Sequence, residues 1–355
     1  MKSQTYKRLA LVAMLFSLVF VVTNVAAKKP VKPPPDDPGG SIQLTPDDDV
    51  WPSDGVDNSG DDDVSGGDGN DIIEGGLGDD WLNGEGGNDI LDGGDGNDRF
   101  DGGPGYDLLL GGAGDDFFYM PVFGETEMDF ADGGDGYDSL LLRDLEYVDL
   151  DVRTGEYTGH YFVVDKRTST KISVSGEFSN FESIMCAKRG GTYHGDDFDN
   201  RFLGNGGEHV MYGHGGNDIL TGGFADSSSD YLDGGDGDDQ LQGVFGDDYL
   251  IGGPGKDIIY IRQGQGHDVM EDFTIGDDTI TIFNSDVCFQ DIHMSLLDVG
   301  GDSTKGDTYI TWKVKNKLNT VSITLLDVEP QDLSETDFDF TWDPDPSTDW
   351  SSECP

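Results

Sequence analysis

Large apolar residues recur at every ninth position through the first third of the chain. They occupy one equivalent position in seven successive segments: Val64, Ile73, Leu82, Leu91, Phe100, Leu109 and Phe118. Glycine, aspartate and asparagine fill most of the positions between them. Neither an α-helix, with about 3.6 residues per turn, nor an ordinary hairpin repeats every nine residues. The period instead predicts a solenoid in which each repeat supplies one turn and one short strand with a single inward side chain.

An aspartate precedes each of these apolar residues by two positions, so it also recurs with a period of nine. The set is Asp62, Asp71, Asp80, Asp89, Asp98, Asp107 and Asp116. The cleanest copy of the repeat, residues 66–74, reads GGDGNDIIE, whereas Glu85 replaces the second glycine of another copy. Because glycine tolerates positive φ, the G-G-x-G-x-D half predicts a tight turn and the last three residues predict a strand.

Two nonapeptides make one coil, so equivalent residues are expected to stack every eighteen positions. One edge of the solenoid would then carry Asp62, Asp80, Asp98 and Asp116, and the other edge Asp71, Asp89 and Asp107. Stacked strands lie about 4.8 Å apart. Bare carboxylates at that spacing repel each other by roughly 3 kcal/mol per pair at an effective dielectric constant of about 20. A single inward apolar side chain per repeat offsets little of this cost.

A hard divalent cation between neighbouring coils would reverse the sign of this interaction. Calcium takes about six to eight oxygen ligands from carboxylates and backbone carbonyls, and glycine-rich turns expose such carbonyls. Magnesium fits less well, because it demands a tighter octahedron and retains its waters. Zinc and copper prefer histidine or cysteine, and the chain has no Cys/His cluster with zinc spacing. The turns therefore predict calcium.

The same spacing returns in a second block, after a break. Its sixth positions are Asn200, His209, Asp218, Asp230, Asp239, Asp248 and Asp257. One further copy, residues 133–141, presents Asp138, and the copy at 222–233 carries three extra residues. Asn200 and His209 depart from the aspartate pattern, and histidine is a poor calcium ligand, so the sites that these two residues share are weakened.

The pattern divides the chain into seven segments. We predict a signal peptide (1–27), a Pro- and Asp-rich linker (28–56), a first repeat block (57–141), an inserted β-rich segment (142–194), a second repeat block (195–261), a C-terminal β cap (262–340) and an acidic tail (341–355). Repeat arrays need an atypical terminal unit to close the exposed core, which is why a cap is expected after the second block.

The first 27 residues have the organisation of a secretory signal peptide. Residues 2–8 carry three basic side chains, residues 9–22 form an apolar run too short to span a bilayer, and residues 25–27 read Val-Ala-Ala. Cleavage is expected before Lys28, with an uncleaved anchor as the alternative. No other apolar run is long enough to cross a membrane. The chain is therefore expected to be secreted into a calcium-rich, oxidising environment. Its three cysteines allow at most one intramolecular bridge, and the sequence does not say which.

The charge of the chain agrees with a demand for cations. Acidic residues number 72 against 21 lysines and arginines, giving a net charge of −51, and glycine occurs 54 times. A polyanion of this size does not bind nucleic acid or an anionic membrane through charge. Salt adaptation or disorder is the alternative explanation, but the acidic residues are periodic rather than scattered.

These nonapeptides resemble the RTX, or haemolysin-type, calcium-binding family, over residues 57–119, 133–141 and 195–261. The resemblance implies an all-β fold, a right-handed parallel β-roll or β-helix solenoid with calcium ions in its turns, that folds only when calcium is supplied. It assigns as ligands Asp62, Asp71, Asp80, Asp89, Asp98, Asp107, Asp116, Asp138, Asp218, Asp230, Asp239, Asp248 and Asp257. Residues 263–273 resemble the segment that joins the last repeats to the C-terminal cap in that family.

Signatures of the catalytic domains that accompany such rolls are missing from the sequence. There is no H-E-x-x-H motif, no G-x-S-x-G motif, and the six histidines are scattered. Paired carboxylates are too abundant to indicate a glycosidase. About 50 residues near 142–194 remain after the repeats, linker and cap are subtracted, too few for a usual catalytic domain. We therefore expect a non-enzymatic, secreted calcium-binding module. The alternatives are an adhesin or a polysaccharide-acting enzyme that uses the roll as a scaffold, with an extracellular polysaccharide or cell-surface partner.

Overall fold

The computed structural model of the chain describes residues 41–52, 59–119, 129–142, 147–153, 156–165, 168–224, 227–262, 266–283, 292–297, 307–313 and 320–339. These residues are all-β and form a parallel β-solenoid, with one short 3₁₀ turn, Glu335–Asp337, and no α-helix among them. The chain divides into two compact units: unit 1 holds Met1–Ser139 and Val174–Asn180, and unit 2 holds Leu140–Ser173 and Phe181–Pro355. The predicted fold class is thus confirmed, while the right-handed coil and the cap stay predictions.

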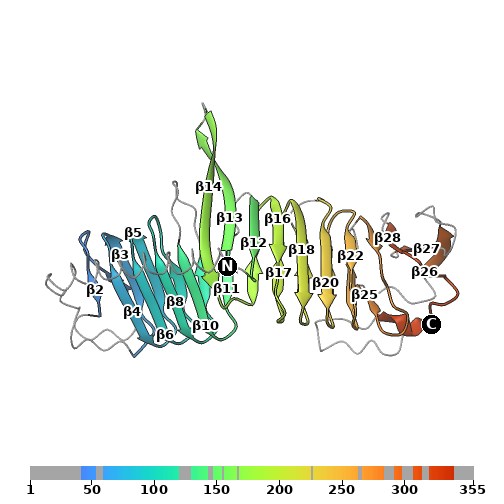
Figure 1. Cartoon of the computed structure of the whole chain (residues 1–355), viewed down its shortest axis with the longest axis horizontal. Coiled ribbons are helices and arrows are strands. Elements are labelled where there is room, and N and C mark those ends of the chain that lie inside the picture. The colour runs from blue at the N-terminus through green and yellow to red at the C-terminus, as the bar shows by residue number, and fades with distance from the viewer. Residues whose placement is uncertain are drawn as a thin grey trace, which may run out of the picture. The chain divides into compact units, whose positions relative to one another are not determined.

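Unit 1 consists of two parallel sheets whose strands alternate along the chain (Figure 1). Sheet 1A contains, in spatial order, β1 (Ser41–Gln43), β3 (Asp63–Asp68), β5 (Trp81–Gly86), β7 (Arg99–Asp101) and β9 (Phe117–Tyr119). Sheet 1B contains β2 (Val50–Trp51), β4 (Ile72–Leu77), β6 (Ile90–Asp95), β8 (Leu108–Ala113), β10 (Phe130–Asp135) and the end of β14 (Thr168–Ser179). Each coil therefore contributes one strand to each sheet.

The register of both sheets confirms the eighteen-residue coil. Val64 lies opposite Leu82 in sheet 1A, and Ile73 lies opposite Leu91 in sheet 1B. Every apolar residue of the nine-residue period in unit 1 is at most 1% exposed. Phe100 and Phe118 stack with ring centroids 4.5 Å apart. The core of unit 1 is thus a column with one side chain per repeat.

Residues 41–51 extend the solenoid ahead of the first recognisable repeat. The sequence assigns them to a linker, but β1 and β2 pair with β3 and β4, and the side chains of Leu44 and Trp51 are buried. Their turn, residues 45–49, reads TPDDD and contains no glycine. The nonapeptide signature is therefore missing although the coil is present.

The coils of unit 1 tolerate an insertion without loss of register. Leu108 of β8 lies opposite Phe130 of β10, a step of 22 residues rather than 18, and β10 in turn pairs with the end of β14. The extra residues fall where the nine-residue period breaks, at 120–128, which lie outside the described residues.

The strands of unit 2 alternate along the chain in the same way (Figure 1). Sheet 2A contains β15 (Ser183–Met185), β17 (Arg201–Leu203), β19 (Ile219–Thr221), β21 (Gln240–Gln242), β23 (Ile258–Arg262), β25 (Thr279–Phe283) and β29 (Phe338–Asp339). Sheet 2B contains β13 (Glu156–Asp165), β12 (Tyr147–Asp151), β16 (Gly190–His194), β18 (Glu208–Gly215), β20 (Tyr231–Asp236), β22 (Tyr249–Ile251), β24 (His267–Met270), β28 (Thr320–Leu325), β27 (Asp307–Lys313) and β26 (Ile292–Leu297). The chain passes between the units in β11 (Ser139–Leu141) and β14.

Antiparallel pairing appears at two places in sheet 2B. β12 pairs antiparallel with β13, in the segment for which the sequence predicts inserted strands. β26, β27 and β28 form an antiparallel meander whose last strand pairs parallel with β24. Between these places in sheet 2B the coil steps are 18, 20 or 21 residues, as in Val210 opposite Tyr231 and Tyr249 opposite Val269.

Two predicted segments, the signal peptide and the acidic tail, lie outside the described residues, and so do two of the three cysteines, Cys288 and Cys354. Within the described part of the chain, no helix is long and apolar enough to cross a membrane. Cys186 is a free, buried thiol, and burial raises its pKa well above the usual range.

Candidate metal centre

The thirteen aspartates predicted as ligands all lie at the start of solenoid strands and are buried. Each is at most 8% exposed. Their position is fixed by the backbone of the next coil: the N–H of Trp81 donates to the carbonyl of Asp62 (2.8 Å), and the N–H of Arg99 donates to that of Asp80 (2.8 Å). The strand ladder therefore begins at the aspartate and holds its backbone in place.

In twelve of the thirteen aspartates, from Asp71 onward, the first carboxylate oxygen accepts a hydrogen bond that joins neighbouring coils. The backbone N–H of Asp62 donates to Oδ1 of Asp80 (2.7 Å), and that of Asp80 donates to Oδ1 of Asp98 (2.7 Å). On the other edge, Asp71 donates in the same way to Oδ1 of Asp89 (2.8 Å). The structure thus has the two edges expected from the eighteen-residue coil, but stacked residues meet through a backbone amide rather than carboxylate to carboxylate.

The second carboxylate oxygen faces into the turn. In eight of these aspartates the buried Oδ2 atom has no hydrogen-bond partner: Asp80, Asp89, Asp98, Asp116, Asp218, Asp239, Asp248 and Asp257. A buried ionised oxygen without a donor costs several kcal/mol, as an order of magnitude. A row of such atoms therefore requires either protons or cations.

Glycine at the first position of each repeat makes room beside that oxygen. A methyl group built on Gly75 would lie 2.2 Å from Oδ2 of Asp80 and 2.8 Å from the carbonyl oxygen of Gly93 in the next coil. The same construction on Gly234 gives 2.3 Å to Oδ2 of Asp239 and 2.7 Å to the carbonyl oxygen of Gly252. Only glycine fits, and its missing side chain leaves a carboxylate oxygen and a carbonyl oxygen from adjacent coils facing one small space.

The electrostatics of the edges favour a bound cation. Burial is the largest cause that raises the pKa of Asp80 to about 7, with repulsion from Asp98 and Asp62 as smaller causes. Burial also raises the pKa of Asp89 to about 8 and that of Asp218 to about 7. Loss of hydration therefore outranks the carboxylate repulsion that the spacing alone suggests.

The donor set is the one that calcium prefers. Within the described residues, no three His, Cys, Asp or Glu side chains converge as a metal cluster. Ligands for an ion would therefore combine carboxylate oxygens with the backbone carbonyls of the glycine turns, as hard divalent cations do. The buried Oδ2 atoms and the glycine spaces fit this requirement.

Four aspartates missed by the sequence analysis continue the two edges. Asp49 donates its N–H to Oδ1 of Asp71 (2.7 Å), and Asp129 accepts at Oδ1 from the N–H of Asp107 (3.1 Å). Asp268 and Asp278 accept from the N–H groups of Asp248 (3.2 Å) and Asp257 (3.0 Å). None of their turns has the complete G-G-x-G signature, and the signal that all four share is an aspartate two residues before a buried apolar residue.

Asn200 and His209 keep the backbone part of the arrangement. Their N–H groups donate to Oδ1 of Asp218 (2.7 Å) and Asp230 (2.8 Å), and both side chains are buried. Neither supplies a carboxylate. Asp230 itself differs from the other aspartates, because its Oδ2 accepts from the N–H of Gly223 (2.8 Å). The second block therefore has fewer equivalent oxygen sites than the first.

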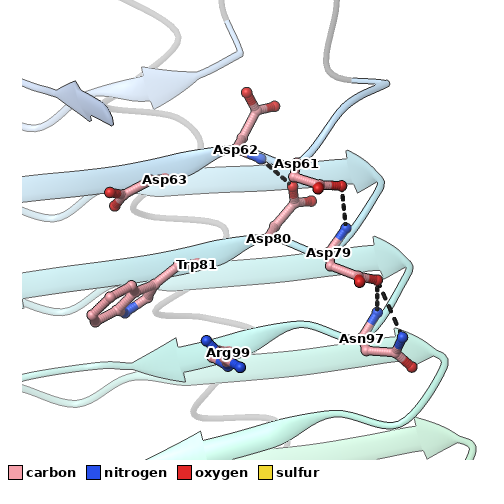
Figure 2. Close-up of a pocket in the computed structure, with 8 residues that line it drawn as sticks. All are labelled: Asp61, Asp62, Asp63, Asp79, Asp80, Trp81, Asn97 and Arg99. Carbon is pink, nitrogen blue, oxygen red and sulfur yellow. Dashed lines mark hydrogen bonds between the residues drawn. The ribbon is translucent and has the colours of Figure 1, made fainter. Parts of the chain in front are cut away.

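An acidic pocket opens on the Asp62 edge of unit 1 (Figure 2). It has a volume of about 320 Å³ and is lined by Asp61, Asp62, Asp63, Asp79, Asp80, Trp81, Asn97 and Arg99. At its rim, the N–H of Asp79 donates to Oδ1 of Asp61 (3.0 Å), and that of Asn97 donates to Oδ1 of Asp79 (2.9 Å). Trp81 is 52% exposed. The pocket combines hard oxygen donors with one aromatic and one cationic side chain.

A comparison with protein-family models agrees with this geometry. A family model described as an RTX calcium-binding nonapeptide repeat matches residues 56–91, 92–119, 194–228, 224–259 and 233–270. A search of curated protein sequences gives no match. Among solved structures, the extracellular lipase LipA from Serratia marcescens is similar at 16% sequence identity and a TM-score of 0.22, with 82% of this chain and 42% of the lipase chain covered. The chain thus spans less than half of that lipase.

Proposed function

The chain carries RTX calcium-binding nonapeptide repeats in both of its units, and from this premise we propose that it is a secreted protein whose β-roll folds when it binds calcium outside the cell. One observation carries the proposal. On each edge, buried Oδ2 atoms face a glycine-lined space that also holds a carbonyl oxygen of the next coil. Calcium at these spaces would convert a row of costly buried charges into bonds between coils.

The ligands proposed are the sixth-position aspartates. Asp80, Asp89, Asp98 and Asp116 supply the best-defined oxygens of unit 1, and Asp218, Asp239 and Asp257 those of unit 2. Bound calcium would supply the positive charge that balances the buried carboxylates along each edge. In the folded roll, the backbone ladder and the Oδ1 hydrogen bonds hold each carboxylate in place, so the protein positions the oxygens that would contact the ion.

Folding should therefore follow the calcium concentration. Extracellular calcium modules bind with dissociation constants of roughly 10⁻⁴ to 10⁻³ M. The cytosolic calcium level would leave the roll unfolded and competent for export, and the level outside the cell would fold it. Far-UV circular dichroism through a calcium titration tests this proposal: strand signal should appear cooperatively with calcium, and a signal already complete in EGTA would rule it out.

Export rests on the signal peptide expected at residues 1–27. The N-terminal sequence of protein collected from the medium of an expressing culture should begin at Lys28. Retention of residues 1–27 on membranes would instead support the uncleaved anchor. A non-enzymatic role is part of the same proposal, because the sequence has none of the catalytic signatures that often accompany such repeats.

A second candidate function is adhesion to an acidic polysaccharide, and it is favoured by the acidic pocket of unit 1. Trp81 offers an exposed ring for stacking against a sugar. Arg99, together with calcium bound to the aspartates of the pocket, would offset the repulsion between these aspartates and a uronate carboxylate. Retention of the calcium-loaded protein on a uronate polymer, lost in Trp81→Ala and Arg99→Ala but kept in Tyr106→Ala, would support this function. Equal retention of all variants, or none, would remove it.

A further inference from the structure

Two histidines that lie twenty residues apart in sequence meet on the outer face of sheet 2B. His194 ends β16 and His214 lies near the end of β18, the neighbouring parallel strand (Figure 1). Nδ1 of His194 and Nε2 of His214 are 3.2 Å apart, and both side chains are partly exposed. No zinc-type spacing is visible in the sequence, since the solenoid coil itself brings the two rings together.

His214 has a backbone conformation that is unfavourable for a residue with a side chain. It takes the second place of its repeat, which is glycine with positive φ in sister copies such as Gly94 (φ 100°) and Gly235 (φ 98°). His214 itself has φ 76°, in the left-handed region that disfavours residues with a side chain. Glu85 (φ 66°) and Val244 (φ 80°) have the same kind of backbone strain at the same place, so the feature that sets His214 apart is the contact of its ring with His194.

Neighbouring groups hold the two rings and add negative charge. The ring of His194 stacks on Tyr212, with centroids 4.7 Å apart and an angle of 5° between the planes. Asp151 of β12 is the register partner of His194, and Asp233 of β20 is the register partner of Tyr212. A carboxylate therefore lies on the strand at each side of the pair, and Arg153 compensates the charge of the Asp151 carboxylate by an ion pair of 2.9 Å.

We propose that His194 and His214 form a binding site for a divalent transition-metal ion such as Zn²⁺ or Cu²⁺, separate from the calcium edges. Imidazole nitrogens are the donors that these ions prefer and that calcium does not. Two nitrogens on a tetrahedral ion, each about 2.0–2.1 Å from it, are about 3.3 Å apart, which matches the observed separation. The described residues offer no cluster of three such side chains, so waters complete the coordination shell.

The site is distinct from the edges in position as well as chemistry. The edge aspartates Asp218 and Asp239 are buried in the turns. The two histidines lie instead on the outer face of the sheet, beside Tyr212 of β18, the strand that pairs with β16 on one side and β20 on the other. A metal held by His194 and His214 would link two neighbouring coils of unit 2.

Isothermal titration with ZnCl₂ and with CuCl₂, on full-length protein saturated with calcium, tests the proposal. One equivalent should bind to the wild type and to His293→Ala, which removes an exposed histidine of β26. It should be lost in His194→Ala and in His214→Gly. Far-UV circular dichroism in calcium checks that each variant is folded, and His214→Gly should keep or raise the melting temperature because glycine relieves the positive φ.

Two outcomes overturn the proposal. Equal uptake by the wild type and by the His194→Ala/His214→Gly double variant would assign the metal to surface carboxylates. No uptake by the wild type would leave the two rings as a hydrogen-bonded pair only. Chemical-shift changes confined to the side-chain nitrogens of two histidines, in ¹⁵N-edited NMR spectra recorded with Zn²⁺, provide an independent readout.

Discussion

The backbone N–H of Asp80 donates a 2.7 Å hydrogen bond to Oδ1 of Asp98, which lies one coil further along the solenoid. This contact uses one oxygen of each carboxylate to fix the distance between coils. It leaves Oδ2 of Asp98 buried, without a hydrogen-bond partner and facing the glycine turn. Along both edges, Oδ1 of an aspartate accepts a hydrogen bond that sets the coil spacing, and Oδ2 of the same residue is available as a ligand.

Replacing an edge aspartate by asparagine separates these two tasks. Asp89→Asn/Asp98→Asn should raise the calcium concentration at the folding midpoint, because each ion loses a charged ligand. The same variant should be more stable than the wild type in EGTA, since an amide oxygen still accepts the inter-coil hydrogen bond without a buried charge. Asn200 occupies an edge position and donates its own N–H to Asp218, but its amide oxygen accepts from the N–H of Asp196 in the same turn rather than from the neighbouring coil.

Controls for this experiment come from the same turns. Asp95→Ala removes an exposed carboxylate at the third position of a repeat and should leave the midpoint unchanged. Asp89→Ala/Asp98→Ala removes the hydrogen bond as well as the charge, so it should be destabilising both with and without calcium. An asparagine variant with the wild-type midpoint would remove these residues from the ligand set.

A methyl group at the first glycine of a repeat should block its site. In Gly93→Ala, the new carbon would lie 2.2 Å from Oδ2 of Asp98 and 2.7 Å from the carbonyl oxygen of Gly111. Overpacking of this kind costs about 1–3 kcal/mol. The calcium midpoint should rise, and the melting temperature in calcium should fall. Gly60→Ala is the matched control, because nothing lies within 4 Å of its methyl group. Equal effects of the two substitutions would contradict the proposed role of the space.

Glycine should stabilise the roll at positions where another residue has positive φ. Glu85 takes the second place of its repeat with φ 66°, so Glu85→Gly should raise the free energy of unfolding by about 1 kcal/mol. Glu74→Gly, in the ordinary strand β4, should lower it by about 0.5–1 kcal/mol. Thermal unfolding in saturating calcium measures both changes. Effects of the same sign would show that the backbone angle of Glu85 is not the cause.

The calcium-free roll should be stabilised by mild acid. Burial raises the pKa of Asp80, Asp89 and Asp116 from 3.8 to about 7, 8 and 7. Because the folded pKa values lie above the unfolded ones, the folded state binds protons more tightly. Its stabilisation is complete below about pH 4 and is lost as the pH rises through 7–8. Strand signal in EGTA should therefore grow between pH 8 and pH 5.

Calcium should show the opposite pH dependence. The ion needs ionised carboxylates, so the calcium midpoint should rise as the pH falls from 8 to 6. Circular dichroism at a series of pH values, with and without EGTA, follows both trends on one sample. A calcium-free roll that loses strand signal on acidification would contradict the burial of these carboxylates.

The core and the two edges could be predicted from the sequence because both follow one period. The coil of eighteen residues places Val64 opposite Leu82, and it also brings the N–H of Asp62 to Oδ1 of Asp80. Asp49, Asp129, Asp268 and Asp278 could not be predicted in this way. Their coils are specified by strand pairing and burial, as in Trp51 opposite Ile73, rather than by glycine turns.

Other features depend on contacts that no local pattern encodes. The antiparallel strands β12 and β13 pair across a turn within an insertion that breaks the period. The pairing of His194 with His214 depends on β16, whose repeat lacks the glycine turn, being in register with β18. The dominance of burial over repulsion at Asp80 likewise emerges only when the depth of the carboxylate in the fold is known.

A crystal structure of the protein grown in calcium tests the central claim most directly. We predict ions along both edges of unit 1, repeating at about the strand spacing of 4.8 Å, with Oδ2 of Asp98 and the carbonyl oxygen of Gly111 at about 2.3–2.6 Å from an ion. Edges that hold only water, or Oδ2 atoms that remain without a metal at saturating calcium, would contradict the account.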